Sequence, residues 1–417
     1  MEQTKNNINI EKTLDYQKNV LLSILGIITY CITYLIGTLF EEASILLRLL
    51  QVFGLFLIAI SLIKAGSFKN LTNVYFKSLL VIIMFWHMSL IIRNCSFEFS
   101  YIKTYFREPY YFLHFFVPLI VLLPANYFAY YFSKSCIIMC NAFLIMLIPC
   151  SYLIFGDQTF SEQYVWVFGT CGGFLLLISH YIKIKRIQVC SLIVVVLSFL
   201  IATYMARRNI MLTFTGYMFA YFCLIFVFSK SFSIVKKIIS VLFLTLLGTG
   251  LIFFFLSNAD STFSRISERA LENSRDEVFL YYFADMSLKD LAVGKGMNGS
   301  YYAPGVDKEN SFGSDSDYRP LIECGYLQMI LKGGIINVII LLLTAIPAFI
   351  KGIFFSNNLF CKSAGFLVAL WLIDMFPWGM PAMDIRYMLF WFCIGVCYNL
   401  ELRSFSDDEV REYCFPL

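Results

Sequence analysis

The chain has little charge. Asp, Glu, Lys and Arg together make up 14% of its 417 residues, whereas hydrophobic residues make up 59%. A soluble domain carries about 25% charged residues. This composition excludes a soluble globular protein. With a mean hydropathy of +0.73, it predicts an integral membrane protein with many spanning segments, and we expect no nucleic-acid partner for it.

Histidine is scarce, and cysteine is not arranged for metal binding. Only three histidines occur, and none lies in the long polar stretch where the triad of a hydrolase would need one. The thirteen cysteines lie mostly within apolar runs and form no CxxC pair, so we predict neither a disulfide framework nor a zinc site. The "VGKGMNG" stretch at 293–299 lacks the full spacing of a nucleotide-binding phosphate loop. No metal or other cofactor is therefore expected.

Long apolar runs are what the chain has in abundance. Runs long enough to cross about 30 Å of hydrocarbon recur along the whole sequence. We predict an all-α integral membrane protein, a single polytopic membrane domain over 1–417 with about twelve transmembrane helices. The predicted spans are 20–40, 45–63, 75–92, 110–131, 136–155, 164–182, 187–206, 209–228, 238–256, 321–350, 357–375 and 383–400.

The distribution of positive charge predicts the orientation. With the N-terminus inside, lysine-rich connections alternate with outer loops such as 40–44 and 156–164, which carry no Lys or Arg. The positive-inside rule then places both ends in the cytoplasm, as tails over 1–19 and 401–417. The first tail is polar and shows no signal-peptide cleavage site. The one long polar segment, 257–320, becomes a large periplasmic loop before the tenth span.

Two adjacent arginines, Arg207 and Arg208, lie between the predicted seventh and eighth spans, with no acidic residue next to them in the sequence. An arginine within the lipid costs about 2.5–3.5 kcal/mol. One interpretation is that both are interfacial anchors. Their outer side and the helix N-terminus that follows them favour an anion site instead.

Arginine is also enriched on the predicted outer side as a whole, whereas lysine dominates the inner side. Because arginine grips phosphate or carboxylate with paired hydrogen bonds, this enrichment predicts an outward-facing anion site. The outer arginines are Arg48, Arg93, Arg107, Arg207, Arg208, Arg265, Arg269, Arg275, Arg319 and Arg386.

A carboxylate stands at the start of an apolar run. Glu323 precedes the "CGYLQMILKGGIINVIILLL" stretch, and ionisable groups at membrane depth are functional hypotheses by default. The alternative is an ion pair with Arg319, one helical turn earlier, and both interpretations stay open. Gly333 and Gly334 in the same run indicate a helix break or a close helix contact.

These features together resemble the superfamily of O-antigen polymerases (Wzy-type) and O-antigen ligases, glycosyltransferases of the bacterial inner membrane. The resemblance rests on twelve spans with both ends inside, "ARRNIML" at the seventh–eighth junction, the large loop before the tenth span, and "GKGMN…IECGYLQMILKGGI". It covers the whole chain in topology, but the motifs are short. Ligases carry His-Asn at the start of the last motif, where this chain has Glu323-Cys324. The missing histidine favours a polymerase.

The resemblance implies a metal-independent polymerase of the inner membrane with a periplasmic active site. Its substrate would be an undecaprenyl-pyrophosphate-linked oligosaccharide in membrane lipid, and its partner a chain-length regulator protein. Developing negative charge on the leaving pyrophosphate would be stabilised by Arg207 or Arg208, and Glu323 would act as base. The implied substrate-binding residues are Arg265, Arg269, Arg275, Arg319 and Tyr318.

Three alternatives stay open at this point. An O-antigen ligase would transfer finished polymer to a lipid A-core acceptor. A polysaccharide flippase or other transporter would need charged or broken helices at the bilayer midplane, and often an internal repeat, which we do not find. A sensor or scaffold protein would not need an arginine-rich outer face.

Overall fold

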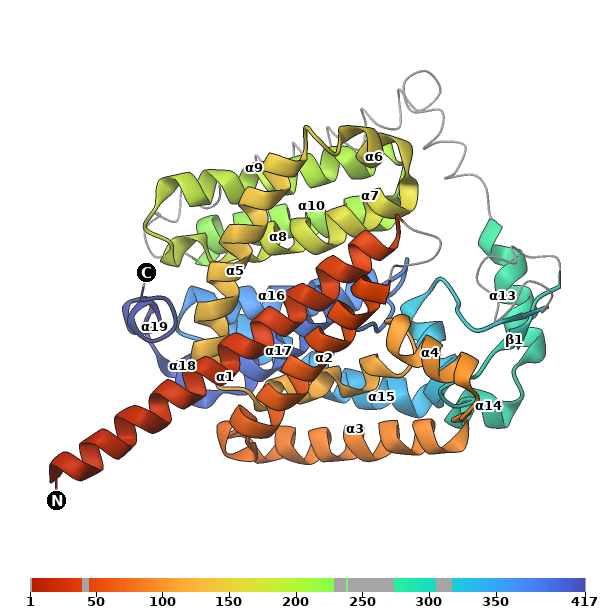
Figure 1. Cartoon of the computed structure of the whole chain (residues 1–417), viewed down its shortest axis with the longest axis horizontal. Helices are drawn as coiled ribbons and strands as arrows, with labels where there is room; N and C mark the ends of the chain where they lie inside the picture. The colour runs from red at the N-terminus through yellow and green to blue at the C-terminus, as the bar shows by residue number, and fades with distance from the viewer. Residues whose placement is uncertain (1, 40–44, 229–237, 239–273, 305–316, 417) are drawn as a thin grey trace.

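The computed structural model describes residues 2–39, 45–228, 238, 274–304 and 317–416. This part of the chain is mostly helical, and the protein is an all-α membrane protein (Figure 1). Its α-helices are α1 (Glu2–Gly37), α2 (Ile45–Ala65), α3 (Val74–Arg93), α4 (Phe99–Arg107), α5 (Ala125–Met146), α6 (Ser151–Gly156), α7 (Gln158–Tyr164), α8 (Thr170–Leu177), α9 (Lys185–Tyr204), α10 (Arg208–Phe222), α13 (Ser274–Asp285), α14 (Leu288–Val293), α15 (Gly325–Phe354), α16 (Leu359–Asp374), α17 (Ile385–Tyr398), α18 (Leu400–Ser404) and α19 (Asp407–Cys414).

Short irregular pieces complete the described structure. Two short strands, β1 (Tyr301–Tyr302) and β2 (Tyr318–Arg319), pair antiparallel with Tyr301 opposite Arg319. The 3-10 helices are Phe68–Asn70, Leu113–Leu122 and Ser179–Tyr181, and the π-helices are Val165–Gly169 and Cys223–Phe228. The strands and α13–α14 belong to the predicted loop 257–320, so the described part of this loop is folded.

Seven helices in the described part of the chain are long and apolar enough to cross a membrane, which agrees with a multi-pass membrane protein. The predicted total of twelve stays a prediction, because shorter helices cover the fourth, sixth, eleventh and twelfth predicted spans. Nearly all of the ninth, 238–256, lies outside the described residues. The seven are Asp15–Gly37, Ile45–Ala65, Val74–Arg93, Ala125–Met146, Lys185–Tyr204, Arg208–Phe228 and Gly325–Phe354.

The boundary predicted between the fourth and fifth spans is wrong. In place of helices over 110–131 and 136–155, the 3-10 helix Leu113–Leu122 is followed by α5, which runs unbroken through Lys134. Pro124 explains the new boundary, because proline has no N–H and cannot continue a helix from the residues before it. It takes the N-cap position of α5 instead. Lys134 therefore lies within a helix and not in a connection.

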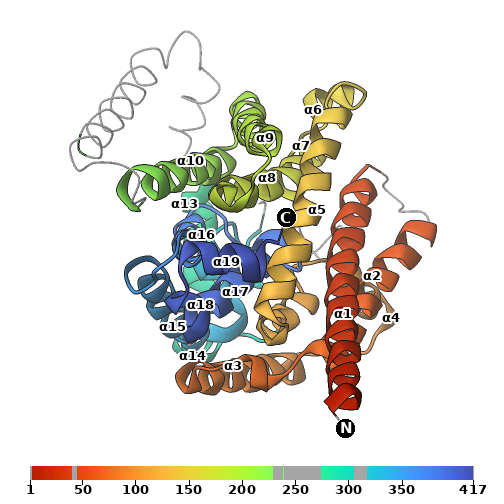
Figure 2. The same cartoon turned by 90° about the vertical axis from the view of Figure 1, so that its left-hand side faces the viewer.

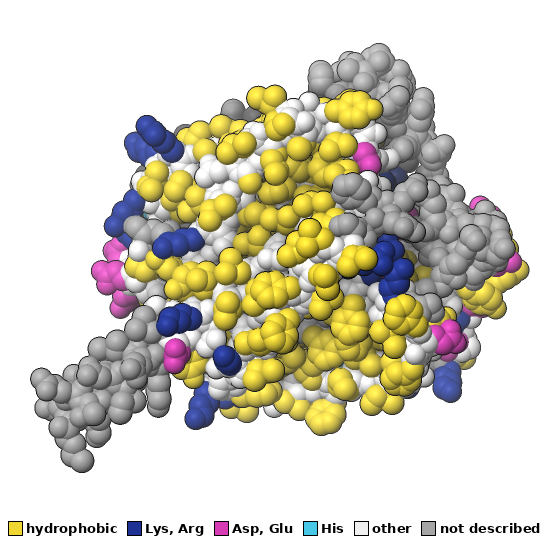
Figure 3. Space-filling model, viewed as in Figure 1, with side chains coloured by type: hydrophobic (Ala, Val, Ile, Leu, Met, Phe, Trp, Pro, Cys, Tyr) yellow, Lys and Arg dark blue, Asp and Glu magenta, His cyan; other side chains and the backbone are white. Residues whose placement is uncertain are grey.

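The helices define two ends of the molecule. The helices α4, α13 and α14 and the two strands gather at one, here called the α13 end, and α18, α19 and the start of α1 gather at the other, the α19 end (Figures 1 and 2). Figure 3 shows a broad hydrophobic surface between them, with lysine and arginine side chains along the α19 end. This is the distribution expected of a protein embedded in a bilayer.

Both predicted tails contain helix. The long helix α1 begins at Glu2 and takes in nearly all of the predicted tail 1–19. At the other end of the chain, residues 401–416 form most of α18 and all of α19, and Val410 and Phe415 are fully buried. The C-terminal segment is therefore packed onto the α19 end.

The helices α1 and α2 pack through two glycines. A Cβ atom on Gly26 would lie 2.6 Å from the carbonyl oxygen of Gly54, and one on Gly54 would lie 2.8 Å from that of Gly26. Apolar side chains gain little by leaving lipid for a helix interface, so close backbone approach through small residues is a main source of association.

Of the two interpretations of Gly333 and Gly334, a helix break or a close helix contact, the break is confirmed. Gly334 has φ +70° and ψ −178° inside α15, a conformation open only to glycine. The "VGKGMNG" turn docks against this break: the backbone N–H of Lys295 donates to Leu331 O at 2.8 Å, and that of Gly296 donates to Lys332 O at 2.9 Å. The loop thus satisfies carbonyls at the interrupted helix.

Replacing Gly334 with alanine is expected to lower the free energy of unfolding by about 1–3 kcal/mol or more, because its φ/ψ values are strained for any side chain. The added Cβ would also lie 2.1 Å from Ala292 O. Thermal unfolding of the purified protein in detergent measures the change. The matched control is Gly37→Ala, where no atom lies within 4 Å of the new Cβ. Equal midpoints for the two variants would contradict this account of the break.

Candidate functional site

The chain reverses direction just before the paired arginines. The helix α9 ends at Tyr204, Ala206 adopts a positive φ of 54°, and Arg207 is the N-cap residue of α10. A positive φ is uncommon for a residue other than glycine. This turn brings the arginines beside α7, toward the α13 end (Figure 1).

Arg207 has a carboxylate partner. Its guanidinium forms an ion pair with Glu162 of α7. The Gln158 amide faces the same group, and its oxygen, once turned toward the guanidinium, accepts hydrogen bonds from Arg207 at 2.8 and 3.1 Å. No acidic residue is next to Arg207 in the sequence. In the fold, however, α7 supplies Glu162, which lies 45 residues earlier in the chain. Arg207 is therefore already neutralised by the protein.

Glu162 brings two predicted site residues into one electrostatic group. Burial raises the pKa of its carboxyl, Arg207 lowers it, and the nearby charge of Glu323 raises it further. Arg386 acts on the same carboxyl and lowers its pKa. Arg207, Glu323 and Arg386, far apart in the sequence, thus act electrostatically on one partly buried carboxylate. We call these four residues the Glu162 cluster.

The pH dependence of stability tests the state of Glu162. A raised pKa means that the folded protein binds this proton more tightly than the unfolded chain, whose value is near 4.5. The free energy of unfolding contributed by this group therefore falls as pH rises from 4.5 through the folded-state pKa. In Glu162→Gln this dependence is lost, so the variant gains stability relative to the wild type across that window. Thermal melts from about pH 4 to about pH 7 measure it, and parallel curves would contradict the assignment.

Arg208, the first residue of α10, is exposed, and no carboxylate of the described residues forms an ion pair with it. It is the member of the arginine pair that is open to an external anion. The chain before α15 is not helical: Arg319 lies in β2, Glu323 lies in a bend, and α15 begins only at Gly325. The predicted pairing of Arg319 and Glu323 assumed that both residues lie on one helical turn. This assumption is wrong, because neither residue is helical.

Of the remaining predicted binding residues, the structure describes some and leaves others outside its described residues. Arg319 is 5% exposed, and its Nε has no hydrogen-bond partner among the described residues. Tyr318 is half exposed, and its ring lies 5.5 Å from that of Tyr302 across the strand pair. Arg265 and Arg269 lie outside the described residues. Arg275 lies in α13, with its side chain outside the described part.

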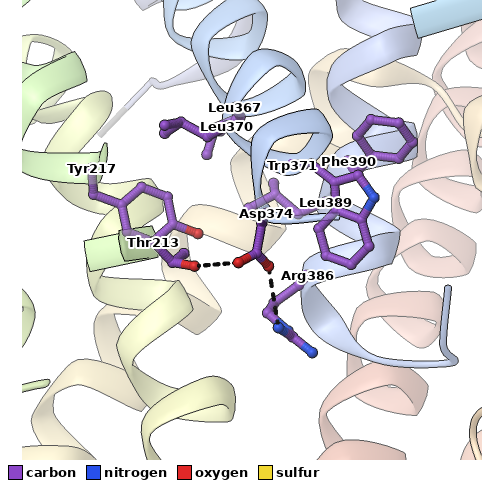
Figure 4. Close-up of a pocket in the computed structure, with 9 residues that line it drawn as sticks. All are labelled: Thr213, Tyr217, Leu367, Leu370, Trp371, Asp374, Arg386, Leu389 and Phe390. Atoms are coloured by element: carbon purple, nitrogen blue, oxygen red, sulfur yellow. Dashed lines mark hydrogen bonds and ion pairs between the residues drawn. The ribbon is translucent and has the colours of Figure 1, made fainter. Parts of the chain in front are cut away.

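Arg386 was predicted only as one of the ten outer arginines, and its partners in the fold were not predicted. At the start of α17 it donates two hydrogen bonds to Asp384 Oδ2, at 3.0 and 2.8 Å, and lies 3.8 Å from Asp374 Oδ2. Its guanidinium stacks over the Trp166 ring at 3.7 Å. Asp374 in turn accepts a hydrogen bond from Thr213 at 3.0 Å, so residues of α10, α16 and α17 meet here (Figure 4).

The ionic group around Arg386 is buried. Arg386 and Asp374 are 6% and 3% exposed, and Trp166 lies on a π-helical turn, a local irregularity often found at functional sites. The cavity beside them holds about 20 Å³, room for about one water molecule. Arg386 therefore supports the neighbouring charges and does not itself enclose a sugar or a diphosphate in this state.

A second buried cation lies in α15. Lys332 is 2% exposed, donates to Gly299 O at 2.8 Å, and lies 5.4 Å from the Tyr111 ring centre. Two histidines, His87 and His114, line the same small cavity. In the described part of the chain, no carboxylate pairs with this ammonium. A lysine inside an apolar run was the signal in the sequence that could have revealed it.

Searches of protein-family models, curated proteins and solved structures found no match to the chain. The resemblance to the polymerase and ligase superfamily therefore stays a prediction from the motifs and the topology. The structural features that bear on function are the Glu162 cluster and the exposed Arg208.

Proposed function

We propose that the protein is a polymerase of O-antigen or a related surface polysaccharide, which joins polyprenyl-diphosphate-linked oligosaccharide repeats at the periplasmic face of the bacterial inner membrane. One observation carries the proposal: in a multi-pass helical protein, the Glu162 cluster lies beside the exposed Arg208, which forms no ion pair with any carboxylate that the structure describes. Anionic and basic groups are thereby available together, as transfer from an anionic leaving group to a hydroxyl acceptor requires.

The proposed reaction is a glycosyl transfer without a metal. A hydroxyl of the acceptor repeat attacks the anomeric carbon of the donor, and the bond from that carbon to the diphosphate oxygen breaks. The polyprenyl diphosphate leaves with the electron pair, and the hydroxyl proton passes to the carboxylate of Glu323. Arg208 binds the leaving diphosphate, with Arg265, Arg269 and Arg275 as further ligands from the large loop.

The ion pair with Glu162 changes the role proposed for Arg207. Because its charge is already compensated, Arg207 holds Glu162 in place and adds less to anion binding than Arg208 does. Arg319 and Tyr318 are proposed to contact the glycan, which stacks on exposed aromatic faces such as the Tyr302–Tyr318 pair. A chain-length regulator protein is the expected partner.

A transporter is the second candidate, because α15 is broken and carries the buried Lys332. The depth of the break argues against it. About 20 residues of helix span the ~30 Å hydrocarbon layer, and 20 residues before Lys351, the basic residue in the last turn of α15, is Leu331. The break at Gly334 then lies near the outer boundary of the membrane, where a periplasmic enzyme needs it, and not at the midplane.

The surface-polysaccharide ladder of a strain that lacks the gene tests the proposal. A ladder collapsed to lipid core plus a single repeat supports a polymerase. Complete loss of polysaccharide from the lipid core, with polymer retained on its carrier, would indicate a ligase instead. An unchanged ladder would contradict both and would favour the transporter or the scaffold protein.

A further inference from the structure

The short helix α4, at the α13 end of the molecule (Figure 1), has one exposed apolar face. Phe99, Ile102 and Phe106 recur at helical spacing, so they lie on the same side of the helix. They are 82%, 36% and 44% exposed, respectively. Lys103 and Arg107, both exposed, lie on the adjoining side. A row of exposed large apolar side chains indicates a surface that contacts another apolar medium.

Another face of α4 is attached to the protein. Tyr105 is 4% exposed, and its hydroxyl accepts hydrogen bonds from the backbone N–H of Ser96 at 2.9 Å and from the side-chain amide of Asn298 at 2.5 Å. These bonds fix the rotation of the helix about its axis. The apolar face is therefore held outward and does not turn into the core.

Two spanning helices set the depth of α4. It begins five residues after the end of α3, and at its other end the Gln51 amide of α2 donates to Arg107 O at 3.2 Å. The helix α2 has 21 residues, about the length that crosses the hydrocarbon layer, so Ile45 at its start lies near the membrane boundary. Gln51, six residues further along, lies about 9 Å inside that boundary. The helix α4 thus descends from the end of α3 into the outer part of the lipid layer.

We propose that α4 is an interfacial membrane helix, which inserts Phe99, Ile102 and Phe106 among the acyl chains of the surrounding lipid. Amphipathic helices of this kind lie about 5–10 Å into the boundary between headgroups and acyl chains, which agrees with the depth of Arg107. Exposed apolar side chains also continue onto this face from α3, where Ile92 in the last turn is 75% exposed. A lipid surface therefore fits the face better than a second protein does. The inference does not depend on the proposed function.

The charges of this segment indicate how the helix is held in the lipid. Residues 98–108 contain two acidic residues, Glu98 and Glu108, and two basic residues, Lys103 and Arg107. Arg107 pairs with Glu108 at 3.3 Å. Because the charges cancel, apolar insertion holds the helix, and attraction to anionic headgroups adds little. Zwitterionic and anionic bilayers should therefore serve equally well.

The membrane contact has a consequence for the neighbouring turn at 293–299. Asn298 in this turn donates to Tyr105 of α4 and also to Asn94 O, at 2.7 Å. The same turn docks against the break in α15. The interfacial helix thus positions the turn, and with it the broken part of α15, at the membrane surface.

Depth-dependent fluorescence quenching tests the inference. A fluorescent amino acid replaces Phe99 or Phe106 in the full-length protein, in liposomes whose phosphatidylcholine carries bromine either near the headgroup or near the chain ends. At Phe99, quenching by the shallow bromine should exceed that by the deep bromine at least about twofold. At Phe106 the ratio should be smaller. Phe85 in α3 is the matched control, because it is 74% exposed and lies about 12 Å before Arg93 along the helix, where the deep bromine should quench more. Asp408, exposed in α19, should be quenched by neither lipid.

Two results would overturn the inference. If neither lipid quenches the label at Phe99 and Phe106 while Phe85 is quenched, water or a second copy of the chain covers the face. If the label at Phe99 gives the same ratio as the label at Phe85, α4 lies deep in the membrane and is not interfacial. Replacing part of the phosphatidylcholine with phosphatidylglycerol should leave the ratios unchanged, and insertion only in the anionic bilayer would contradict the proposed apolar insertion.

Discussion

Replacing Arg208 with alanine is expected to abolish chain elongation, with a loss of at least about a hundredfold in rate, while the level of the protein in the membrane stays unchanged. Arg208 is exposed and forms no ion pair with the described carboxylates, so its removal leaves no buried charge unpaired. Under the proposed mechanism, the leaving diphosphate loses its nearest uncompensated positive charge. The measurement is the polysaccharide ladder of a deletion strain that carries the variant, with protein level followed by immunoblot.

Two further variants make the Arg208 result specific. Arg208→Lys keeps the charge but loses the paired hydrogen bonds, so partial elongation is expected. Arg186→Ala removes an exposed arginine from the opposite end of α9 and should leave the ladder intact. Full elongation by Arg208→Ala at normal protein level would reject its proposed role.

Replacing Arg386 with alanine is expected to destabilise the fold by about 3–5 kcal/mol, the cost of leaving a buried ionic partner uncompensated. Its guanidinium is almost fully buried between Asp374 and Asp384 and over the Trp166 ring. The predicted result is a large fall in the thermal unfolding midpoint and in the amount of protein in the membrane. Detergent melts of the purified variant measure it.

The control for Arg386 is an arginine with a similar partner but an exposed setting. Arg411 pairs with Asp408, whose side chain is 87% exposed, and such surface pairs contribute about 0–1 kcal/mol. Arg411→Ala should therefore leave the midpoint close to that of the wild type. If Arg386→Ala changed the unfolding midpoint as little as Arg411→Ala does, the buried ionic group would not stabilise the fold as predicted.

The sequence predicted the class of fold well because hydrophobicity and helix length are local properties. Predicted spans over 45–63 and 75–92 nearly coincide with α2 and α3, and the two glycines of α15 correctly indicated a break. The junction at 131–136 was wrong because the polar residues 133–135 suggest a connection, whereas α5 runs through them. The start of α5 is marked in the sequence by Pro124, and hydropathy alone does not detect a helix boundary set by proline.

The site was harder to predict because its partners come from distant segments. Arg207 and Glu162 are 45 residues apart, and Arg386 meets Trp166 and Asp374 only in the folded chain. Sequence spacing identified the exposed arginine pair but could not show that one member is neutralised. The ion-pair premise for Arg319 and Glu323 also failed, since it assumed a helix that begins only at Gly325.

The most direct test of the central claim is reconstitution of the reaction. Under the proposal, a strain lacking the gene accumulates single repeats on undecaprenyl diphosphate, and these can be extracted and added to liposomes that contain the purified protein. We predict longer lipid-linked oligosaccharides and one released undecaprenyl diphosphate for each bond formed. Single repeats that cross the bilayer without becoming longer, or that stay unchanged, would contradict the polymerase account.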